Sequence, residues 1–346
     1  MIAATLAAPG RVELKEVPQP ELAESGAALV RNTRAGICGS DLYLYDGRME
    51  IEPDFPLGHE YVGVVEAIGP DVRLIEIGDR VAGSFSVSCG RCGPCQRGWH
   101  QRCLMLRFIG FGFAFGDLPG AQSQYIAVPE ADLTLRKIPD VISDDAAVML
   151  GDNIVTAVDV LHRGRLQPGQ VVAVMGAGPT GLLTAQAALA LGASSVVVSD
   201  QVGHRLKCAE RIGATAVDIT TSDPLDAVLE LSGFQGADLV VEATSTAQGT
   251  ADAVALARKG GVIAVTTVHA DGEVTIPLGE MWLKDLDLVM HQVDVQARLD
   301  AVVALVASGR LDPEVVITHR IPLDDVAEGY RMAASREAGK VILTPN

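Results

Sequence analysis

From about residue 168 onward, short apolar segments alternate with segments in which apolar residues recur at helical spacing. The sequence VVAVMG is followed by LLTAQAALALGA, SVVVSD and GHRLKCAERIGA, and the alternation continues through ADLVVEATS, TADAVALARKG and GVIAVTTV. Strands that alternate with helices form a parallel sheet with helices on both of its faces. The pattern therefore predicts a doubly wound α/β domain with about six strands.

A glycine-rich turn joins the first of these strands to its helix. Gly176, Gly178 and Gly181 have the spacing Gly-x-Gly-x-x-Gly. The first glycine permits a tight turn, the second lets the backbone approach a pyrophosphate, and the third lets the helix pack closely on the strand. The anion then meets the free N–H groups of the helix N-terminus. Because the turn lies between a strand and a helix, it predicts a dinucleotide site.

The second strand ends in Asp200, nineteen residues after Gly181. A carboxylate at this position can accept hydrogen bonds from both ribose hydroxyls of an adenosine, and it repels a 2′-phosphate. It therefore favours NAD over NADP. The alternative role for Asp200 is an N-cap of the next helix, but that role does not explain the glycine spacing.

Four cysteines lie close together in the segment CGRCGPCQRGWHQRC, at Cys89, Cys92, Cys95 and Cys103. Closely spaced thiolates separated by glycine and proline are typical of a structural zinc site. Four thiolates complete the coordination of the ion and leave no position for a substrate. A pair of disulfides is the alternative, but it requires an oxidising compartment, and the opening sequence MIAATLAAPGRVELKEV has no pattern of a secretory signal. We therefore expect a cytoplasmic protein.

Composition limits the remaining possibilities. A chain of 346 residues suits two domains. A formal net charge of −17 disfavours nucleic acid and anionic membranes as partners, because both require clustered Lys and Arg. No apolar run reaches the length of a membrane span. Residues 1 to about 135 contain short extended runs broken by Gly, Pro and Asp, which indicates an antiparallel β region.

A second group of metal-binding residue types is spread along the chain. Cys38 lies in the turn-rich segment GICGSD, and His59 and Glu60 lie in PLGHEYVG. Asp152 precedes the predicted nucleotide domain. Together Cys38, His59 and Asp152 would give a metal ion three protein ligands and an open fourth position. A lone histidine is more often a structural residue, so this prediction depends on the three residues coming together.

These motifs, in this order, resemble the medium-chain zinc-dependent alcohol dehydrogenases over essentially the whole chain. The pattern is similar to that of bacterial secondary-alcohol and polyol dehydrogenases. GICGSD resembles the first-ligand turn, GHEYVGVVEAIG the histidine signature, and the cysteine segment the structural-zinc lobe. The resemblance implies a GroES-like β-rich catalytic domain at 1–152 carrying both zinc sites and a Rossmann NAD-binding domain at 153–290. It also implies that residues 291–346 return to the catalytic domain.

The resemblance also implies roles for the residues of the second metal group. Cys38, His59 and Asp152 would hold a catalytic zinc, and Glu60 would bind it transiently. Glu130 and Asp145 are rivals of Asp152, but neither is followed four residues later by a threonine such as Thr156. The resemblance further implies that Ser40 would accept the alcohol proton. Tyr43 stands where many relatives have the histidine that passes this proton to solvent. Water, the ribose or His291 would therefore complete the relay.

The implied cofactor site combines both parts of the chain. Its residues are Thr156, Gly176, Gly178, Pro179, Thr180, Gly181, Asp200, Arg205, Val268 and Lys340. In relatives, a basic side chain at the position of Lys340 meets the pyrophosphate; a solvated surface charge is the alternative. The implied substrate pocket contains Tyr43, Phe85 and Phe111, and Trp282 is a looser candidate. For Phe111 and Trp282, core packing is the favoured explanation.

The sequence thus predicts an NAD-dependent zinc oxidoreductase of class EC 1.1.1.-, with two zinc ions per subunit. It would transfer hydride between NAD and an alcohol, with secondary alcohols and polyols as the favoured classes. Zinc would act as a Lewis acid on the substrate oxygen. The alternatives are a zinc-free quinone or enone reductase on the same scaffold, a zinc lyase or epimerase that recycles bound NAD, and a nonenzymatic nucleotide sensor. The resemblance further implies a homotetramer, with a dimer as the second choice.

Overall fold

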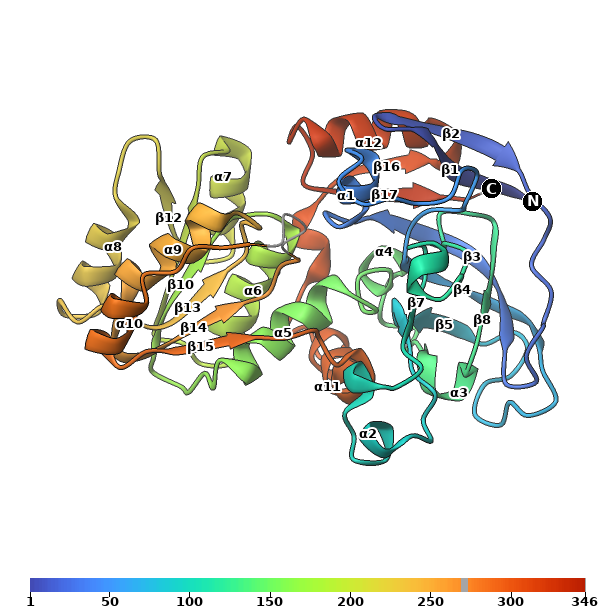
Figure 1. Ribbon diagram of the computed structural model, residues 1–346, viewed down its shortest axis with the longest axis horizontal. Helices are drawn as coiled ribbons and strands as arrows, with labels where there is room; N and C mark the ends of the chain where they lie inside the picture. The colour runs from blue at the N-terminus through green and yellow to red at the C-terminus, as the bar shows by residue number, and fades with distance from the viewer. Residues whose placement is uncertain (269–272, 346) are drawn as a thin grey trace. The chain divides into compact units, whose positions relative to one another are not determined.

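The computed structural model describes residues 1–268 and 273–345 of the chain. The chain forms two compact units (Figure 1). The first unit contains Met1–Val155 and Asp294–Asn346, and the second contains Thr156–Val293. The boundaries expected from the sequence lie three residues away, at 152 against 155 and at 290 against 293.

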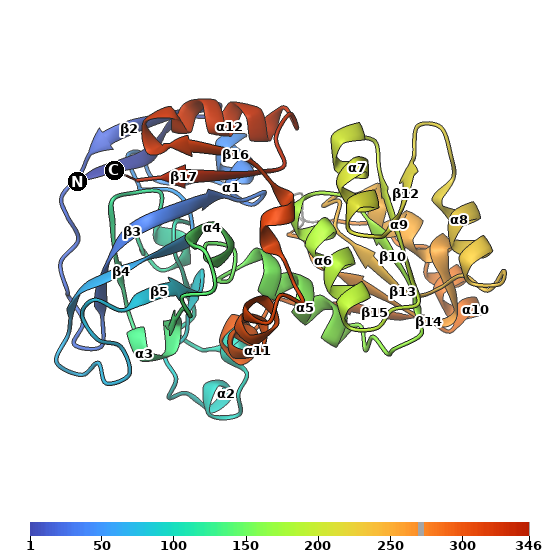
Figure 2. The ribbon, with the colours of Figure 1, turned by 180° about the vertical axis from the view of Figure 1, so that it is seen from behind.

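The first unit is built on a largely antiparallel sheet. Its strand order is β16-β17-β3-β4-β5-β9, with β8 paired to β3. Strand β17 pairs with β3 so that Val341 lies opposite Ile37. This pairing places the last strand of the chain in the same sheet as a strand from its first forty residues (Figure 2). The strands are β3 (Ala28–Ile37), β4 (Glu60–Ile68), β5 (Arg80–Gly83), β8 (Tyr125–Val128), β9 (Leu135–Lys137), β16 (Ile317–Pro322) and β17 (Lys340–Thr344).

Two hydrophobic clusters hold this unit together. One lies within the sheet and contains Tyr61, Val65 and Ile126, all at most 2% exposed. The other joins the two ends of the chain, since Leu6 packs in the same cluster as Tyr330 and Leu343. The remaining elements of this unit are β1 (Ile2–Ala8), β2 (Arg11–Glu16), β6 (Ser86–Val87), β7 (Arg107–Phe108), α1 (Asp41–Tyr45), α2 (Gly93–Gln96), α3 (Ala131–Thr134), α4 (Asp144–Ala147), α11 (Val295–Ala307) and α12 (Val326–Ala334), with 3-10 turns η1 (His100–Arg102), η2 (Phe113–Phe115), η3 (Pro313–Val316) and η4 (Leu323–Asp325).

The second unit contains a six-stranded sheet in the order β12-β11-β10-β13-β14-β15. All of its paired strands are parallel, and helices flank the sheet (Figure 1). The elements are β10 (Val171–Met175), β11 (Ser195–Asp200), β12 (Thr215–Asp218), β13 (Ala237–Glu242), β14 (Ala257–Val265), β15 (Asp287–Met290), α6 (Pro179–Ala190), α7 (Gly203–Arg211), α8 (Pro224–Leu231), α9 (Ala247–Leu256) and α10 (Leu278–Lys284). Helix α5 (Asn153–Arg163) begins in the first unit and continues into the second.

The strand order of the second unit determines where a ligand can bind. The order reverses at β10. From β10 the chain builds the sheet on one side through β11 and β12, and it then crosses to the other side of β10 and continues through β13, β14 and β15. In an open parallel sheet, such a reversal leaves a crevice beyond the carboxyl ends of the strands. Every residue of β10 is buried, as expected for a central strand covered on both faces. The structure thus contains both predicted parts, a β-rich domain with a largely antiparallel sheet and a doubly wound α/β domain.

In the described parts of the chain, each helix falls short of the length and apolar character needed to cross a membrane.

Candidate functional site

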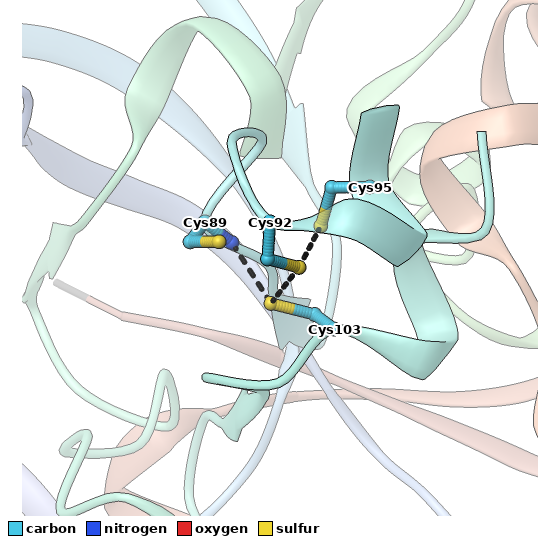
Figure 3. A group of neighbouring side chains, drawn as sticks. All are labelled: Cys89, Cys92, Cys95 and Cys103. Carbon is cyan, nitrogen blue, oxygen red and sulfur yellow. Dashed lines mark hydrogen bonds between the residues drawn. The ribbon is translucent and has the colours of Figure 1, made fainter. Parts of the chain in front are cut away.

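The four cysteines of the segment CGRCGPCQRGWHQRC come together on a lobe that follows β6. Their sulfur atoms all lie within 4.8 Å of one another. Cys92 Sγ is 3.4 Å from Cys95 Sγ and 3.9 Å from Cys103 Sγ, and Figure 3 shows these side chains turned toward each other. The six cysteines, which all lie in the described part of the chain, form no disulfide there, so the disulfide alternative has no support in the structure.

The chemistry of this lobe fits a zinc ion. The backbone N–H groups of Cys89 and Met105 donate to Cys103 Sγ at 3.2 and 3.3 Å, and such bonds stabilise a thiolate. Backbone hydrogen bonds lower the pKa of Cys92 to about 6, whereas burial and the neighbouring thiols raise the pKa of Cys95 to about 12. A bound cation would remove this imbalance, because a coordinating thiol is deprotonated outright.

A second group of ligand types forms at the end of β3. Cys38, His59, Glu60 and Asp152 offer ligand atoms that all lie within 4.8 Å of one another. Asp152 Oδ2 is 3.3 Å from Cys38 Sγ and 3.3 Å from His59 Nε2. These residues come from the end of β3, the start of β4 and the start of α5. The mixed sulfur, nitrogen and carboxylate set fits a zinc ion that keeps an open position.

The sheet register places two of these residues together. In the antiparallel pairing of β3 with β4, Gly36 lies opposite Glu60. Cys38 comes two residues after Gly36, and His59 comes directly before Glu60, so both lie at the same end of the paired strands. A Cβ atom at Gly36 would lie 1.9 Å from Glu60 Oε2. Gly36 is therefore required for the buried carboxylate to enter the group.

Asp41 orients the histidine of this group. Its carboxylate Oδ1 lies 3.0 Å from His59 Nδ1, and its Oδ2 accepts hydrogen bonds from Cys38 N at 2.9 Å and Gln122 Nε2 at 3.1 Å. The pairing leaves His59 Nε2 to face Asp152, as in the carboxylate–histidine–metal arrangement of zinc sites. Sequence reasoning missed Asp41, although its position three residues after Cys38 in GICGSD was a usable signal.

The charges in this group explain the shifted pKa values. Burial alone would lower the pKa of His59, but the carboxylates of Asp41 and Asp152 raise it well above its ordinary value. Burial would raise the pKa of Asp152, but His59 holds it below its ordinary value. Burial and the nearby carboxylates raise the pKa of Cys38 to about 11. A cation bound here must therefore displace protons from His59 and Cys38.

Lys340 is a buried residue. Its side chain is 1% exposed and forms an ion pair with Glu60, while its Nζ donates to Ile37 O at 3.1 Å. The surface-charge alternative is therefore wrong, and the pyrophosphate contact that the resemblance implies for Lys340 stays a prediction. Burial raises the pKa of Glu60 despite the attraction of Lys340.

The proton-relay candidates occupy different surroundings. Ser40 Oγ lies 3.3 Å from His59 Nε2, at the edge of the second metal group. Tyr43 is 5% exposed, and the Arg48 guanidinium lies 4.2 Å from the centre of its ring. His291 Nε2 lies 3.3 Å from Asp159 Oδ2 within the second unit.

The rivals of Asp152 have other partners. Asp145 accepts a hydrogen bond from Arg34 Nε at 2.7 Å and one from Arg320. Glu130 accepts one from Arg91 at 2.8 Å. Neither carboxylate belongs to the second metal group, whose carboxylates are Asp152 and Glu60.

Two of the predicted pocket residues lie against the metal group. The ring centroids of Phe111 and Phe85 are 5.1 and 6.0 Å from that of His59. Trp282, in the second unit, is 81% exposed. Core packing is therefore wrong as an explanation for Trp282.

The glycine-rich turn has the geometry expected of a dinucleotide loop. Gly176 has a φ of +93°, and a Cβ at Gly181 would lie 2.0 Å from Gly176 O. Gly178 is the N-cap of α6, with open space where its Cβ would be, and Pro179 and Thr180 begin the helix. The turn therefore leaves the N-terminus of α6 open to an anion.

Asp200 anchors this turn to the neighbouring strand. Its Oδ2 accepts a hydrogen bond from Ala177 N at 2.7 Å, and its Oδ1 accepts bonds from Gln201 N and Val202 N at 2.7 and 2.9 Å. Helix α7 has Val202 as its N-cap, so the capping alternative for Asp200 is wrong. The other expected cofactor residues of this unit are Thr156 in α5, Arg205 in α7 and the 55% exposed Val268 after β14.

Glu242 is a buried carboxylate that sequence reasoning missed. It ends β13 and accepts hydrogen bonds from Thr244 N at 2.6 Å and Thr267 Oγ1 at 3.1 Å. It therefore links the loops that follow β13 and β14 at the carboxyl edge of the sheet. A charged residue closing the apolar strand ADLVVE was the available signal.

Comparisons with known proteins agree with these two units. Residues 24–140 match the alcohol dehydrogenase GroES-like domain, and residues 179–308 match the zinc-binding dehydrogenase family. A protein of Mycobacterium tuberculosis named "Probable zinc-binding alcohol dehydrogenase" is 35% identical over 94% of this chain and 84% of its own length. The structure of the alcohol dehydrogenase TADH from Thermus sp. ATN1 is 38% identical, with a TM-score of 0.96 over the whole of both chains.

Two further structures are described with bound nicotinamide cofactors. A zinc-binding dehydrogenase from Sinorhizobium meliloti bound to NADP is 29% identical, with a TM-score of 0.88 over 99% of both chains. A dehydrogenase from Escherichia coli complexed with NADH is 28% identical, with a TM-score of 0.86 over 99% of both chains. The chain studied here belongs to the medium-chain zinc-dependent alcohol dehydrogenase family.

Proposed function

We propose that this protein is an NAD-dependent zinc dehydrogenase that oxidises an alcohol and reduces the matching carbonyl compound. Secondary alcohols and polyols are the favoured substrate classes. The observation that carries the proposal is the group of Cys38, His59 and Asp152, which offers three ligands of zinc-binding chemistry beside Ser40. Zinc at such a site acts as a Lewis acid that lowers the pKa of an oxygen bound to it.

The surrounding residues of the chain have separate tasks in this reaction. Asp41 holds the ring of His59 so that Nε2 faces the ligand group. Ser40, whose Oγ lies 3.3 Å from His59 Nε2 at the edge of the ligand group, would accept the proton of the substrate hydroxyl and pass its own hydroxyl proton to the cofactor ribose. Glu60 would supply a fourth ligand, and Lys340 balances its charge when it is not bound to the metal.

NAD is the proposed hydride acceptor. The pyrophosphate would bind over Gly178 at the N-terminus of α6, and Asp200 would accept hydrogen bonds from the adenosine ribose. Because Asp200 already holds Ala177 N, one carboxylate would order the glycine-rich turn and exclude a 2′-phosphate. Thr156, Arg205 and Val268 are the remaining proposed contacts.

We further propose two zinc ions per subunit, one in each ligand group. The proposed location is the cytoplasm, whose reducing conditions suit six cysteines that form no disulfide in the described part of the chain. A homotetramer is the proposed assembly, with a dimer as the second choice, and a small molecule is the proposed substrate.

The test is absorbance of NADH during incubation of the zinc-loaded protein with primary, secondary, polyol and aromatic alcohols, repeated with NADP and after chelation. Chelator-sensitive NADH formation is expected, and Cys38→Ser should abolish it. The exposed-site variant Asp46→Asn serves as the control. If zinc and NAD bind but no NADH accumulates with any alcohol, the proposal fails and an NAD-recycling lyase or epimerase becomes the better assignment. Turnover that survives complete zinc removal would instead favour the zinc-free reductase.

A further inference from the structure

Phenylalanine is concentrated in one small part of this chain. The chain contains 7 phenylalanines, and aromatic residues make up only 4% of it. Four of the phenylalanines fall within residues 108–115, in the sequence FIGFGFAF, and a fifth is Phe85. Such clustering in a chain that is otherwise poor in aromatic residues indicates a local use for the rings.

The structure joins four of these rings to the second metal group. Phe111 and Phe85 contact the ring of His59, as described above. Phe108 then lies 6.0 Å from Phe85 and 6.4 Å from Phe111 between ring centroids, and Phe115 lies 5.8 Å from Phe108 and 6.1 Å from Phe111. We call Phe85, Phe108, Phe111 and Phe115 the aromatic wall.

The wall runs from the interior to the surface of the first unit. His59 is 2% exposed, Phe85, Phe108 and Phe111 are half-buried, and Phe115 is 37% exposed. A contiguous row of partly exposed rings is costly to leave in water, and such patches mark sites where an apolar group binds. Here the row begins at a candidate zinc ligand, so the group that covers it would belong to a molecule held at that metal.

The backbone fixes the wall relative to His59. Ile109 N donates to Phe85 O at 2.9 Å, which couples the two parts of the wall. Gly110 has a φ of +79°, and a Cβ there would lie 2.3 Å from Gly58 O, next to His59. Gly112 and Gly116 also have positive φ values, so the segment turns tightly enough to present its rings together. The wall is therefore built into the fold of this unit.

Two charged side chains beside the wall, Glu52 and Arg107, are already hydrogen-bonded to other groups of the protein. Glu52 accepts a hydrogen bond from Phe113 N at 3.0 Å, which anchors the tip of the segment. Arg107 donates to Glu24 at 2.7 Å. A polyol or amino-acid substrate lying against the rings would lose hydrogen bonds to water without replacing them, whereas a hydrocarbon group would gain by leaving water.

We infer that the aromatic wall selects alcohols whose carbinol carbon carries an apolar ring or a branched hydrocarbon group, and disfavours polyols. This inference rests on the proposed function and narrows it to one substrate class. The oxygen of the alcohol would lie at the metal group, and its hydrocarbon part would cover Phe111, Phe108 and Phe115.

The test compares kcat/KM for 1-phenylethanol, 2-propanol and sorbitol in the holoenzyme and in three variants. In the wild-type protein, 1-phenylethanol should be the best substrate and sorbitol the poorest. Phe115→Ala should lower the ratio of kcat/KM for 1-phenylethanol over 2-propanol about tenfold, which corresponds to about 1.4 kcal/mol of lost apolar contact. Phe115→Leu should restore part of that ratio. Leu74→Ala, an exposed apolar position outside the wall, should leave it unchanged.

A second readout is independent of turnover. Fluorine NMR line broadening should report binding of 4-fluoroacetophenone to the wild-type protein and weaker binding to Phe115→Ala. A kcat/KM for sorbitol that equals or exceeds that for 1-phenylethanol would overturn the inference and leave the proposed function intact. Equal ratios and equal binding in Phe115→Ala and Leu74→Ala would do the same. No NADH from any alcohol would overturn the proposed function, and this inference with it.

Discussion

The Asp41 carboxylate contacts His59 and Cys38, two candidate zinc ligands, without belonging to the ligand group itself. We expect Asp41→Asn, which keeps the shape but removes the charge, to lower zinc affinity about 10- to 100-fold. Competition with a chromogenic chelator measures this affinity. Asp46→Asn, at an exposed position five residues later, is the matched control. Equal zinc affinity in both variants would show that the Asp41 charge has no part in binding.

Lys340 makes a second prediction at the scale of single residues. Lys340→Met leaves Glu60 without its ion-pair partner in a site that is 0% exposed, and removing one partner of a buried ion pair costs about 3–5 kcal/mol. We expect a loss of this size in the free energy of unfolding, measured in urea on the metal-free protein. The double variant Lys340→Met with Glu60→Gln should recover most of it. A double variant as unstable as the single one would argue that the loss comes from packing.

At the scale of elements, the cysteine lobe connects β6, α2 and η1 through four side chains (Figure 3). We expect Cys95→Ser to lower the zinc content of the purified chain from about two ions to about one. The substitution removes one of the four ligands, and a structural zinc site needs all four. Elemental analysis measures the content. Cys208→Ala, a buried cysteine in α7 outside both groups, is the control and should keep both ions.

Asp145 connects three elements of the first unit. It lies in α4 and pairs with Arg34 of β3 and Arg320 of β16. Burial would raise the pKa of Asp145, but the two guanidinium groups hold it below its ordinary value of 3.8. The stabilisation is therefore present in full above that value and is lost as the pH falls through the lower folded-state pKa.

We expect Asp145→Asn to lower the free energy of unfolding by about 2 kcal/mol at pH 7, the scale of hydrogen bonds to charged groups. The difference from the wild-type protein should shrink below pH 3.8. Denaturant titrations at a series of pH values measure it, with the exposed Asp140→Asn as control. A difference that stayed constant across this range would exclude the ion pairs as its source.

At the scale of the whole molecule, the two units carry different ligand groups. Both candidate metal groups lie in the first unit, and the glycine-rich turn lies in the second. A ligand stabilises the unit that binds it, by about 2.7 kcal/mol at a hundredfold excess over Kd. Calorimetry should therefore show chelation lowering the Tm of one transition and NAD raising the Tm of the other. A single transition that responds equally to both treatments would contradict this expectation.

The sequence by itself determined the family, the fold class and the contiguous motifs. The cysteine lobe and the glycine-rich turn are local, so residue type and spacing are sufficient to predict their members. The alternation of strands and helices likewise predicts a parallel sheet, because each strand must be covered on both faces. Cys38, His59 and Asp152 lie far apart in the chain, so their residue types only suggested a shared metal site, and the family resemblance was needed to assign their roles.

Only the tertiary structure decided what surrounds the second metal group. The pairing of β17 with β3 buries Lys340 beside Glu60, and no local pattern in the last residues predicts that partner. The contact of Asp41 with His59 likewise depends on the register of β3 against β4. The aromatic wall is visible in the sequence as a run of phenylalanines, but its contact with His59 requires the Gly58–Gly110 approach. Such contacts form between residues distant in the chain, whereas spacing along the sequence constrains only near neighbours.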